Sequence, residues 1–156
     1  MGHFVDVTRK EGHIFFEIEF VSYNQLSDNT STIMLDSGAY LTVISSDVAI
    51  EYGFDSLPYK SVDLHGFTGS TPAKLITVPG LKIAGCVITQ VNILVPIDTS
   101  IKTVVLGQNV LEYFNYKVDH DEGRIYFDKN PNPKPQSKYI DLVGCGGVFT
   151  SNLDET

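Results

Sequence analysis

The chain has 156 residues, of which 42% are hydrophobic and 19% charged, which is the make-up of one globular domain able to bury its own core. Its formal net charge of −8, with no cluster of Lys or Arg, argues against nucleic acid as a partner. No apolar run approaches membrane-spanning length and no secretory signal is present, so we expect a cytoplasmic protein without a membrane span.

The two cysteines predict neither a disulfide framework nor a metal site. Cys86 and Cys145 lie far apart and belong to no Cys-x-x-Cys or His-rich cluster. Two free thiols are the expected state, with one long-range disulfide left open if the protein is exported. The glycine-rich segments at residues 65–70 and 144–147 lack the Gly-Lys-Ser/Thr ending that holds phosphate. We therefore expect no metal and no cofactor.

Near the start of the chain, alternating residues predict a half-buried strand. Over residues 14–21, aromatic and aliphatic side chains alternate with Glu17 and Glu19, the period of two that is typical of a strand with one buried face. Residues 4–8 are predicted to pair with it, through a turn in which Gly12 can take a positive φ.

Two apolar runs then flank a short polar loop. Residues 32–35 and 41–44 are predicted to be strands, and residues 36–39 form the loop between them. Ser46 is a candidate N-cap for a short helix over residues 47–52.

The middle of the chain predicts more strands and another short helix. Residues 62–76 read as a hairpin with a glycine-flanked turn, and residues 82–95 as two strands joined near Gly85 or as one bent strand. Residues 103–106 form a further buried strand, followed by a short helix that Asn109 could cap.

A last hairpin and a tail complete the predicted organisation. Residues 116–118 and 124–127 flank a polar turn of hairpin type. We divide the chain into a main domain at 1–130, a proline-rich spacer at 131–136 and a tail at 137–156, which could add a strand or act as a regulatory segment.

The loop between the two central strands carries the candidate chemistry. It reads Asp36-Ser37-Gly38-Ala39 and places a carboxylate directly after a buried strand, where water is partly excluded. Taken alone, Asp-Ser-Gly is also a common turn sequence, in which Asp makes local hydrogen bonds and Gly supplies conformational freedom. The tetrapeptide by itself leaves both interpretations open.

The surroundings of this loop resemble those of a known family. An apolar strand precedes it, Thr42-Val43-Ile44 follows it, a glycine-rich hairpin turn lies near residue 66, and the run Val-Val-Leu-Gly-Gln-Asn-Val-Leu ends at Leu111. Together these elements resemble the retropepsins, the single-domain aspartic proteases of retroviral type, over about residues 14–127. The resemblance implies an all-β, acid-protease-like closed barrel with one or two short helices, active as a two-fold homodimer.

The same resemblance implies the site residues. Asp36 matches the catalytic acid, and Leu106-Gly107 match the apolar-Gly step that packs beside the catalytic loop. The loop and the flap, a hairpin tip that folds over a bound peptide, supply the expected substrate-binding residues: Ser37, Gly38, Ala39, Gly66, Phe67, Thr68 and Gly69. The sequence has a single Asp-Ser/Thr-Gly, so the second carboxylate would come from Asp36 of an identical chain.

The expected activity is hydrolysis of extended polypeptides. Two carboxylates held that close share one proton, so the ionised one activates a water while the protonated one binds the scissile carbonyl. Two other functions stay open: a catalytically inactive dimer of the same fold that binds peptides or acts as a scaffold, and a small-ligand β-barrel in which Asp36 is only a turn residue.

Overall fold

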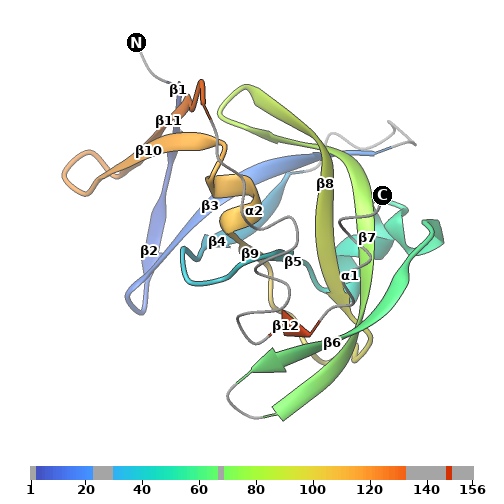
Figure 1. Ribbon diagram of the computed structural model, residues 1–156. Helices are drawn as coiled ribbons and strands as arrows, with labels where there is room; N and C mark the ends of the chain where they lie inside the picture. The colour runs from blue at the N-terminus through green and yellow to red at the C-terminus, as the bar shows by residue number, and fades with distance from the viewer. Residues whose placement is uncertain (1–2, 23–29, 67–68, 133–146, 149–156) are drawn as a thin grey trace.

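The computed structural model describes residues 3–22, 30–66, 69–132 and 147–148. In this part of the chain the structure is mostly β, with two short α-helices and one 3-10 turn (Figure 1). The strands are β1 (His3–Asp6), β2 (Thr8–Lys10), β3 (His13–Val21), β4 (Ser31–Leu35), β5 (Thr42–Val43), β6 (Lys60–Gly66), β7 (Gly69–Ile83), β8 (Cys86–Pro96), β9 (Val105–Leu106), β10 (Phe114–Asp119), β11 (Arg124–Lys129) and β12 (Gly147–Val148). The helices are α1 (Ser46–Glu51), the 3-10 turn η1 (Phe54–Ser56) and α2 (Gln108–Leu111).

The described strands form two sheets. One has three strands in the order β1-β11-β10, and the other has nine in the order β12-β6-β7-β8-β5-β9-β4-β3-β2. β7 also pairs with β3, from Glu19↔Lys82 to Val21↔Gly80, which requires the large sheet to curl. The β6–β7 hairpin projects from the body of the molecule on the side away from β1, β10 and β11 (Figure 1).

The N-terminal strand differs from the prediction. Residues 4–8 do not form one strand. β1 pairs with β11, so of these two strands only β2 pairs with β3. The chain changes partner at Val7, whose N–H donates to the carbonyl of Gly123 at 2.9 Å. The predicted turn is confirmed, because Glu11 and Gly12 both have positive φ, 53° and 83°. The local pattern identified the turn but could not reveal the distant partner.

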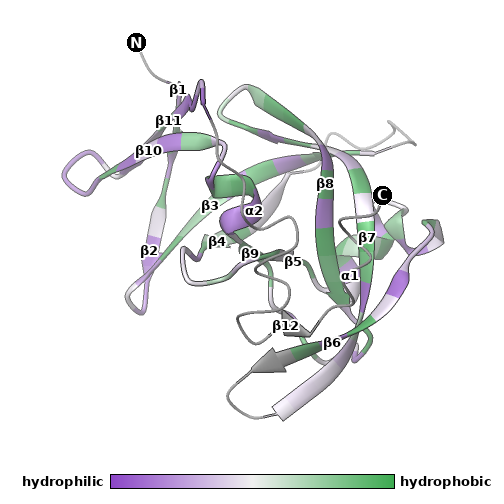
Figure 2. Ribbon diagram, viewed as in Figure 1, coloured by the Kyte–Doolittle hydropathy of each residue, from purple (hydrophilic) through white to green (hydrophobic). Residues whose placement is uncertain are grey.

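The main core collects the buried faces of the strands around an aromatic cluster. Phe20 on β3 packs edge-on against Tyr52 and Phe54, with ring centroids 5.2 and 5.9 Å apart. Alternate residues of β3 are buried as predicted: Phe16, Ile18 and Phe20. Figure 2 shows hydrophobic stretches along β3, β7 and β8, whereas polar residues gather on the turn between β10 and β11.

The first helix is present but begins with a different cap. Ser45, not Ser46, is the N-cap, and its hydroxyl accepts a hydrogen bond from the Val48 N–H at 3.4 Å. Ser45 has the extended backbone of a cap residue, φ −71° and ψ 159°, whereas Ser46 is already helical. Asp47 lies in the first turn, where a carboxylate interacts favourably with the helix dipole.

The predicted hairpins are confirmed, with longer strands than expected. β7 and β8 are two strands joined by a turn at Ala84 and Gly85, which have φ of 50° and 82°. The β6–β7 hairpin pairs from Lys60↔Leu75 to Gly66↔Gly69. β10 and β11 pair up to Asp119↔Arg124.

The C-terminal tail contributes one short described strand. β12 pairs antiparallel with β6, through Gly147↔Leu64 and Val148↔Asp63. The remainder of the tail and most of the proline-rich spacer lie outside the described residues. Over the described ranges, no helix is long and apolar enough to span a bilayer.

We predict that Tyr52→Phe changes how stability depends on alkaline pH. The Tyr52 and Ser31 hydroxyls lie 3.0 Å apart in the core, and burial raises the pKa of Tyr52 above its ordinary value. A raised folded-state pKa gives a contribution that is complete below the unfolded pKa of about 10 and lost as pH rises through the folded value. Urea denaturation from pH 7 to 11 should show a smaller alkaline loss in Tyr52→Phe.

The control is Tyr59→Phe, which also removes one phenol hydroxyl but at a residue that is 52% exposed. The prediction is contradicted if Tyr52→Phe and wild type lose stability in parallel above pH 10.

Candidate active site

β4, an inner strand of the large sheet between β9 and β3, carries the chain to Asp36. It pairs in parallel with β9, matching Met34 to Val105 and Leu35 to Leu106. The Asp36 N–H then donates to the Leu106 carbonyl at 3.2 Å, so the pairing continues one residue past the strand. The half-buried Asp36 is thereby fixed at the end of β4, which is partly buried where the sequence predicted a buried strand.

The loop after Asp36 folds back on the aspartate. The Gly38 N–H donates to Asp36 Oδ1 at 3.0 Å, and the Ala39 N–H donates to the Asp36 carbonyl at 3.2 Å. A Cβ on Gly38 would lie 3.4 Å from Asp36 Oδ1, so glycine keeps that side of the carboxylate open. Ser37 and Gly38 are both exposed, which leaves the loop accessible to a ligand.

The start of α2 holds the loop from its other side. The Gln108 N–H donates to the Ala39 carbonyl at 2.8 Å, and the Asn109 N–H to the Tyr40 carbonyl at 2.9 Å. The Gln108 side chain adds a bond from Nε2 to the Ser37 carbonyl at 2.7 Å. The N–H groups that a helix start leaves without helical partners are used here to fix the loop.

Gly107 lies where two segments of backbone cross. A Cβ at this position would come within 2.5 Å of the Leu41 carbonyl carbon and 2.6 Å of its oxygen, closer than real Cβ atoms approach. The Gly107 N–H donates to the buried Thr42 Oγ1 at 3.1 Å. Only glycine permits this crossing, which accounts for the apolar-Gly step seen in the sequence.

Asn109 joins the same crossing and is not the helix cap. The N-cap of α2 is Gly107, and Asn109 lies inside the helix. Its Oδ1 accepts from the Thr42 N–H at 3.0 Å and from Thr42 Oγ1 at 2.9 Å, while Nδ2 donates to the Asn92 carbonyl at 2.7 Å. Sequence reasoning missed Thr42 and Asn92. A threonine inside an otherwise apolar run was the available signal for the first.

The two strands of the crossing are shorter than predicted. The expected strands at 41–44 and 103–106 are reduced to β5 and β9, of two residues each. β5 pairs with β8 in parallel and meets β9 at Val43↔Val105. Contacts with the 36–39 loop and with α2 replace strand pairing on either side. Only two residues of each segment therefore pair as regular strands.

An apolar cluster connects this loop to the base of the β6–β7 hairpin. Ala39 of the loop and Leu64 of β6 pack against the same set of buried residues. Those residues come from β5 and its approach, β6, β7, β8 and β9: Leu41, Val43, Val62, Ala73, Leu75, Leu94 and Val105. The hairpin therefore contacts the hydrophobic surroundings of Asp36 through its base.

The predicted flap residues are only partly described. Gly66 and Gly69 are cross-strand partners that close the β6–β7 ladder, and Gly69 has a φ of 118° that favours glycine. Phe67 and Thr68 lie outside the described residues. Cys86 is half-buried and forms no disulfide, and Cys145 also lies outside the described part.

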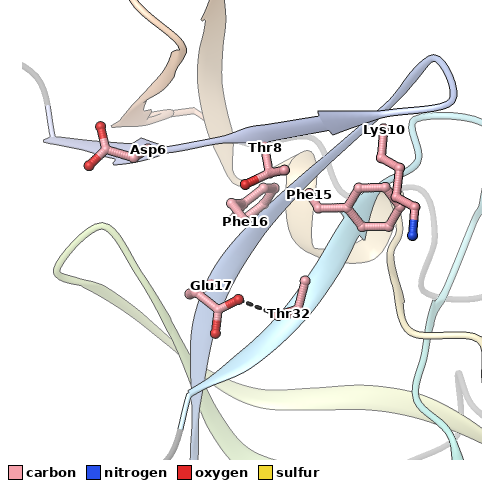
Figure 3. Close-up of a pocket in the computed structure, with 7 residues that line it drawn as sticks. All are labelled: Asp6, Thr8, Lys10, Phe15, Phe16, Glu17 and Thr32. Carbon is pink, nitrogen blue, oxygen red and sulfur yellow. Dashed lines mark hydrogen bonds between the residues drawn. The ribbon is translucent and has the colours of Figure 1, made fainter.

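Two cavities lined by described residues lie elsewhere. One of about 390 Å³ opens beside β2, β3 and β4 and is lined by Asp6, Thr8, Lys10, Phe15, Phe16, Glu17 and Thr32 (Figure 3). Its Glu17 carboxylate already accepts hydrogen bonds from Thr30 and Thr32. A smaller, mainly apolar cavity of about 200 Å³ lies beside α1 and the end of β8. Neither cavity includes a residue of the 36–39 loop, and the described residues contain no cluster of metal-ligating side chains.

Comparison with known proteins agrees with this geometry. The model of a family described as "gag-polyprotein putative aspartyl protease" matches residues 24–113, more than half of the chain. The chain therefore belongs to this retropepsin-like family of aspartic proteases.

A solved structure shares the fold. It is the crystal structure of a retropepsin-like aspartic protease from Rickettsia conorii, with a TM-score of 0.58 and 20% sequence identity. The match covers 80% of this chain and 87% of that one. At this identity the likeness shows the fold alone. No curated protein matches the chain.

We predict that Thr42→Val destabilises the protein by about 1–3 kcal/mol, because it keeps the side-chain shape but leaves the buried Gly107 N–H without an acceptor. The matched control is Thr77→Val, since Thr77 Oγ1 also donates to an asparagine, Asn92 Oδ1 at 2.7 Å, but on the exposed side of the sheet. That change should stay within about 0.5 kcal/mol of wild type. Equal urea midpoints for both variants would contradict the importance of the crossing.

Proposed function

We propose that this chain is an aspartic endopeptidase that hydrolyses extended polypeptides, using a water activated between Asp36 and the Asp36 of a second, identical chain. Membership of the retropepsin-like family supports the aspartic protease class. The observation that carries the proposal is the fixed position of Asp36. Its backbone N–H is bound to Leu106 and its carboxylate to Gly38, while the loop stays exposed.

The proposal includes a homodimer because the chemistry needs two carboxylates. The sequence contains a single Asp-Ser/Thr-Gly, so one chain supplies one catalytic aspartate. A two-fold axis through the loops would bring the two Asp36 side chains face to face, in a contact that repeats itself on both sides. We also propose that the curled sheet forms the closed barrel of the acid proteases within residues 1–130.

The paired carboxylates act as acid and base together. Repulsion between two negative charges at short distance leaves the pair with one shared proton. The ionised Asp36 takes a proton from a water, and the protonated one donates a hydrogen bond to the scissile carbonyl. The water attacks to give a tetrahedral intermediate, whose collapse releases the amine after proton transfer. No covalent bond to the enzyme forms.

The substrate is proposed to be an extended peptide held between the loop and the β6–β7 hairpin. Ser37, Gly38 and Ala39 form the floor, and the hairpin tip at Gly66, Phe67, Thr68 and Gly69 forms the cover. An extended peptide can pair its main chain with both, as in strand addition. The apolar cluster shared by Ala39 and Leu64 favours hydrophobic side chains beside the cut.

We predict that Asp36→Asn lowers peptide cleavage by at least about 100-fold, the lower range of general acid-base contributions, because an amide cannot take the proton from water. Cleavage of an unstructured peptide library, followed by mass spectrometry across acidic and neutral pH, measures this. The control is Asp47→Asn, at an exposed carboxylate in the first turn of α1 that pairs with Lys102 at 2.5 Å. Equal cleavage by wild type and Asp36→Asn would refute the assignment.

We predict that activity per chain falls on dilution, because a site shared between two chains dissociates with the dimer. Sedimentation velocity over a concentration series should give a dimer whose dissociation midpoint coincides with the loss of activity. Full activity in a species that sediments as a monomer would contradict the shared site.

A further inference from the structure

The second edge of β6 has an occupant within the chain. Over its whole length, from Lys60 to Gly66, β6 pairs on one edge with β7. Its other edge is paired with β12, through Gly147↔Leu64 and Val148↔Asp63 (Figure 1). Since a strand has two hydrogen-bonding edges, β12 takes up the one that β7 leaves available.

This edge belongs to the strand that leads into the proposed cover of the active site. Val62 and Leu64 point to the same face of β6, because residues two apart in a strand share a face. Both are part of the apolar cluster that also contacts Ala39 of the Asp36 loop. A strand added to this edge therefore runs beside the base of a hairpin that shares an apolar cluster with the Asp36 loop.

A peptide that extends from the hairpin tip along β6 needs the main-chain groups that β12 uses. A peptide that binds by strand addition needs unpaired N–H and C=O groups on a sheet edge. Neighbouring residues of a strand direct these groups to opposite edges, so one of the two residues opposite β12, Asp63 or Leu64, offers its N–H and C=O on the edge that β12 occupies. The sequence around β12, Gly-Gly-Val-Phe-Thr, is uncharged and contains Val and Phe, side chains that apolar subsites accept.

We propose that the C-terminal segment around Gly147–Val148 is an internal competitor of the peptide substrate, bound to the edge of β6 that does not pair with β7. The inference rests on the proposed function, because the competition matters only if peptides bind there. A segment tethered to the same chain competes at an effective concentration in the millimolar range, so even weak pairing lowers the apparent affinity for substrate. The segment must leave the edge before a peptide can bind.

The first test removes the ability of the segment to pair. Gly147→Pro/Val148→Pro in the full chain eliminates both N–H groups, and proline cannot extend a ladder. The matched control, Gly147→Ala/Val148→Thr, keeps both N–H groups. The proline pair should lower KM for a peptide supplied in trans by about three- to tenfold with kcat unchanged, as relief of competition requires. Equal KM values for the proline pair and its control would overturn the proposal.

The second test fixes the segment in place. Directly opposed residues of an antiparallel pair are close enough for a disulfide, so Asp63→Cys/Val148→Cys should crosslink on oxidation. The background is Cys86→Ser/Cys145→Ser, and Asp55→Cys/Val148→Cys is the control pair. Oxidation should abolish cleavage in trans, and reduction should restore it. Failure to crosslink, or full activity of the crosslinked protein, would overturn the proposal.

The two proposals fail in different ways. If wild type cleaves peptides and the proline pair matches its control, the active site stands and the competing segment does not. If no variant cleaves peptides or binds a peptide mimic with a central hydroxyl, the proposed function fails and this inference fails with it.

Discussion

The structure depends on the crossing of two backbone segments at Gly107. No side chain fits there, because a Cβ would lie 2.5 Å from the Leu41 carbonyl carbon. This close approach lets α2 begin directly beneath the Asp36 loop, so that its first N–H groups reach Ala39 and Tyr40. It also brings β4 and β9 together in parallel, which fixes the backbone of Asp36. The Asp36 loop thus takes its geometry from a glycine far along the chain.

Buried polar groups at the crossing fix the two backbone segments relative to one another through hydrogen bonds. Thr42 is fully buried and uses its N–H and hydroxyl together, accepting from Gly107 and donating to Asn109. In a low-dielectric interior such a network is strong when complete and costly when one member is lost. A site that must hold a reacting group to within a fraction of an ångström benefits from supports with few alternative arrangements. The positions of Thr42 and Asn109 therefore bear on the chemistry proposed at Asp36, although neither touches Asp36 in the described contacts.

The sequence predicted those features that local patterns determine. The alternation in β3 and the turns at Gly12 and Gly85 depend on residues near each other in the chain, and so does the presence, but not the geometry, of a loop at Asp36. It failed where distant segments decide the outcome, because nothing in residues 4–8 indicates that β1 pairs with β11. Asn109 was misread as a cap for the same reason: its partner Thr42 lies 67 residues away. The sequence offered no signal for the partner of Gly147–Val148.

The pairing of β12 with β6 also bears on how the proposed peptide-binding edge is protected when no peptide is bound. An unpaired sheet edge invites association with other chains, and proteins usually protect it with prolines, charges or bulges. A strand that must accept peptides cannot be protected in these ways, since each would also exclude the substrate. A segment of the same chain that pairs weakly and can leave satisfies both requirements, because it covers the edge only while no peptide competes. Protection of β6 and access to Asp36 would then be two states of one equilibrium, set by how strongly Gly147–Val148 pairs.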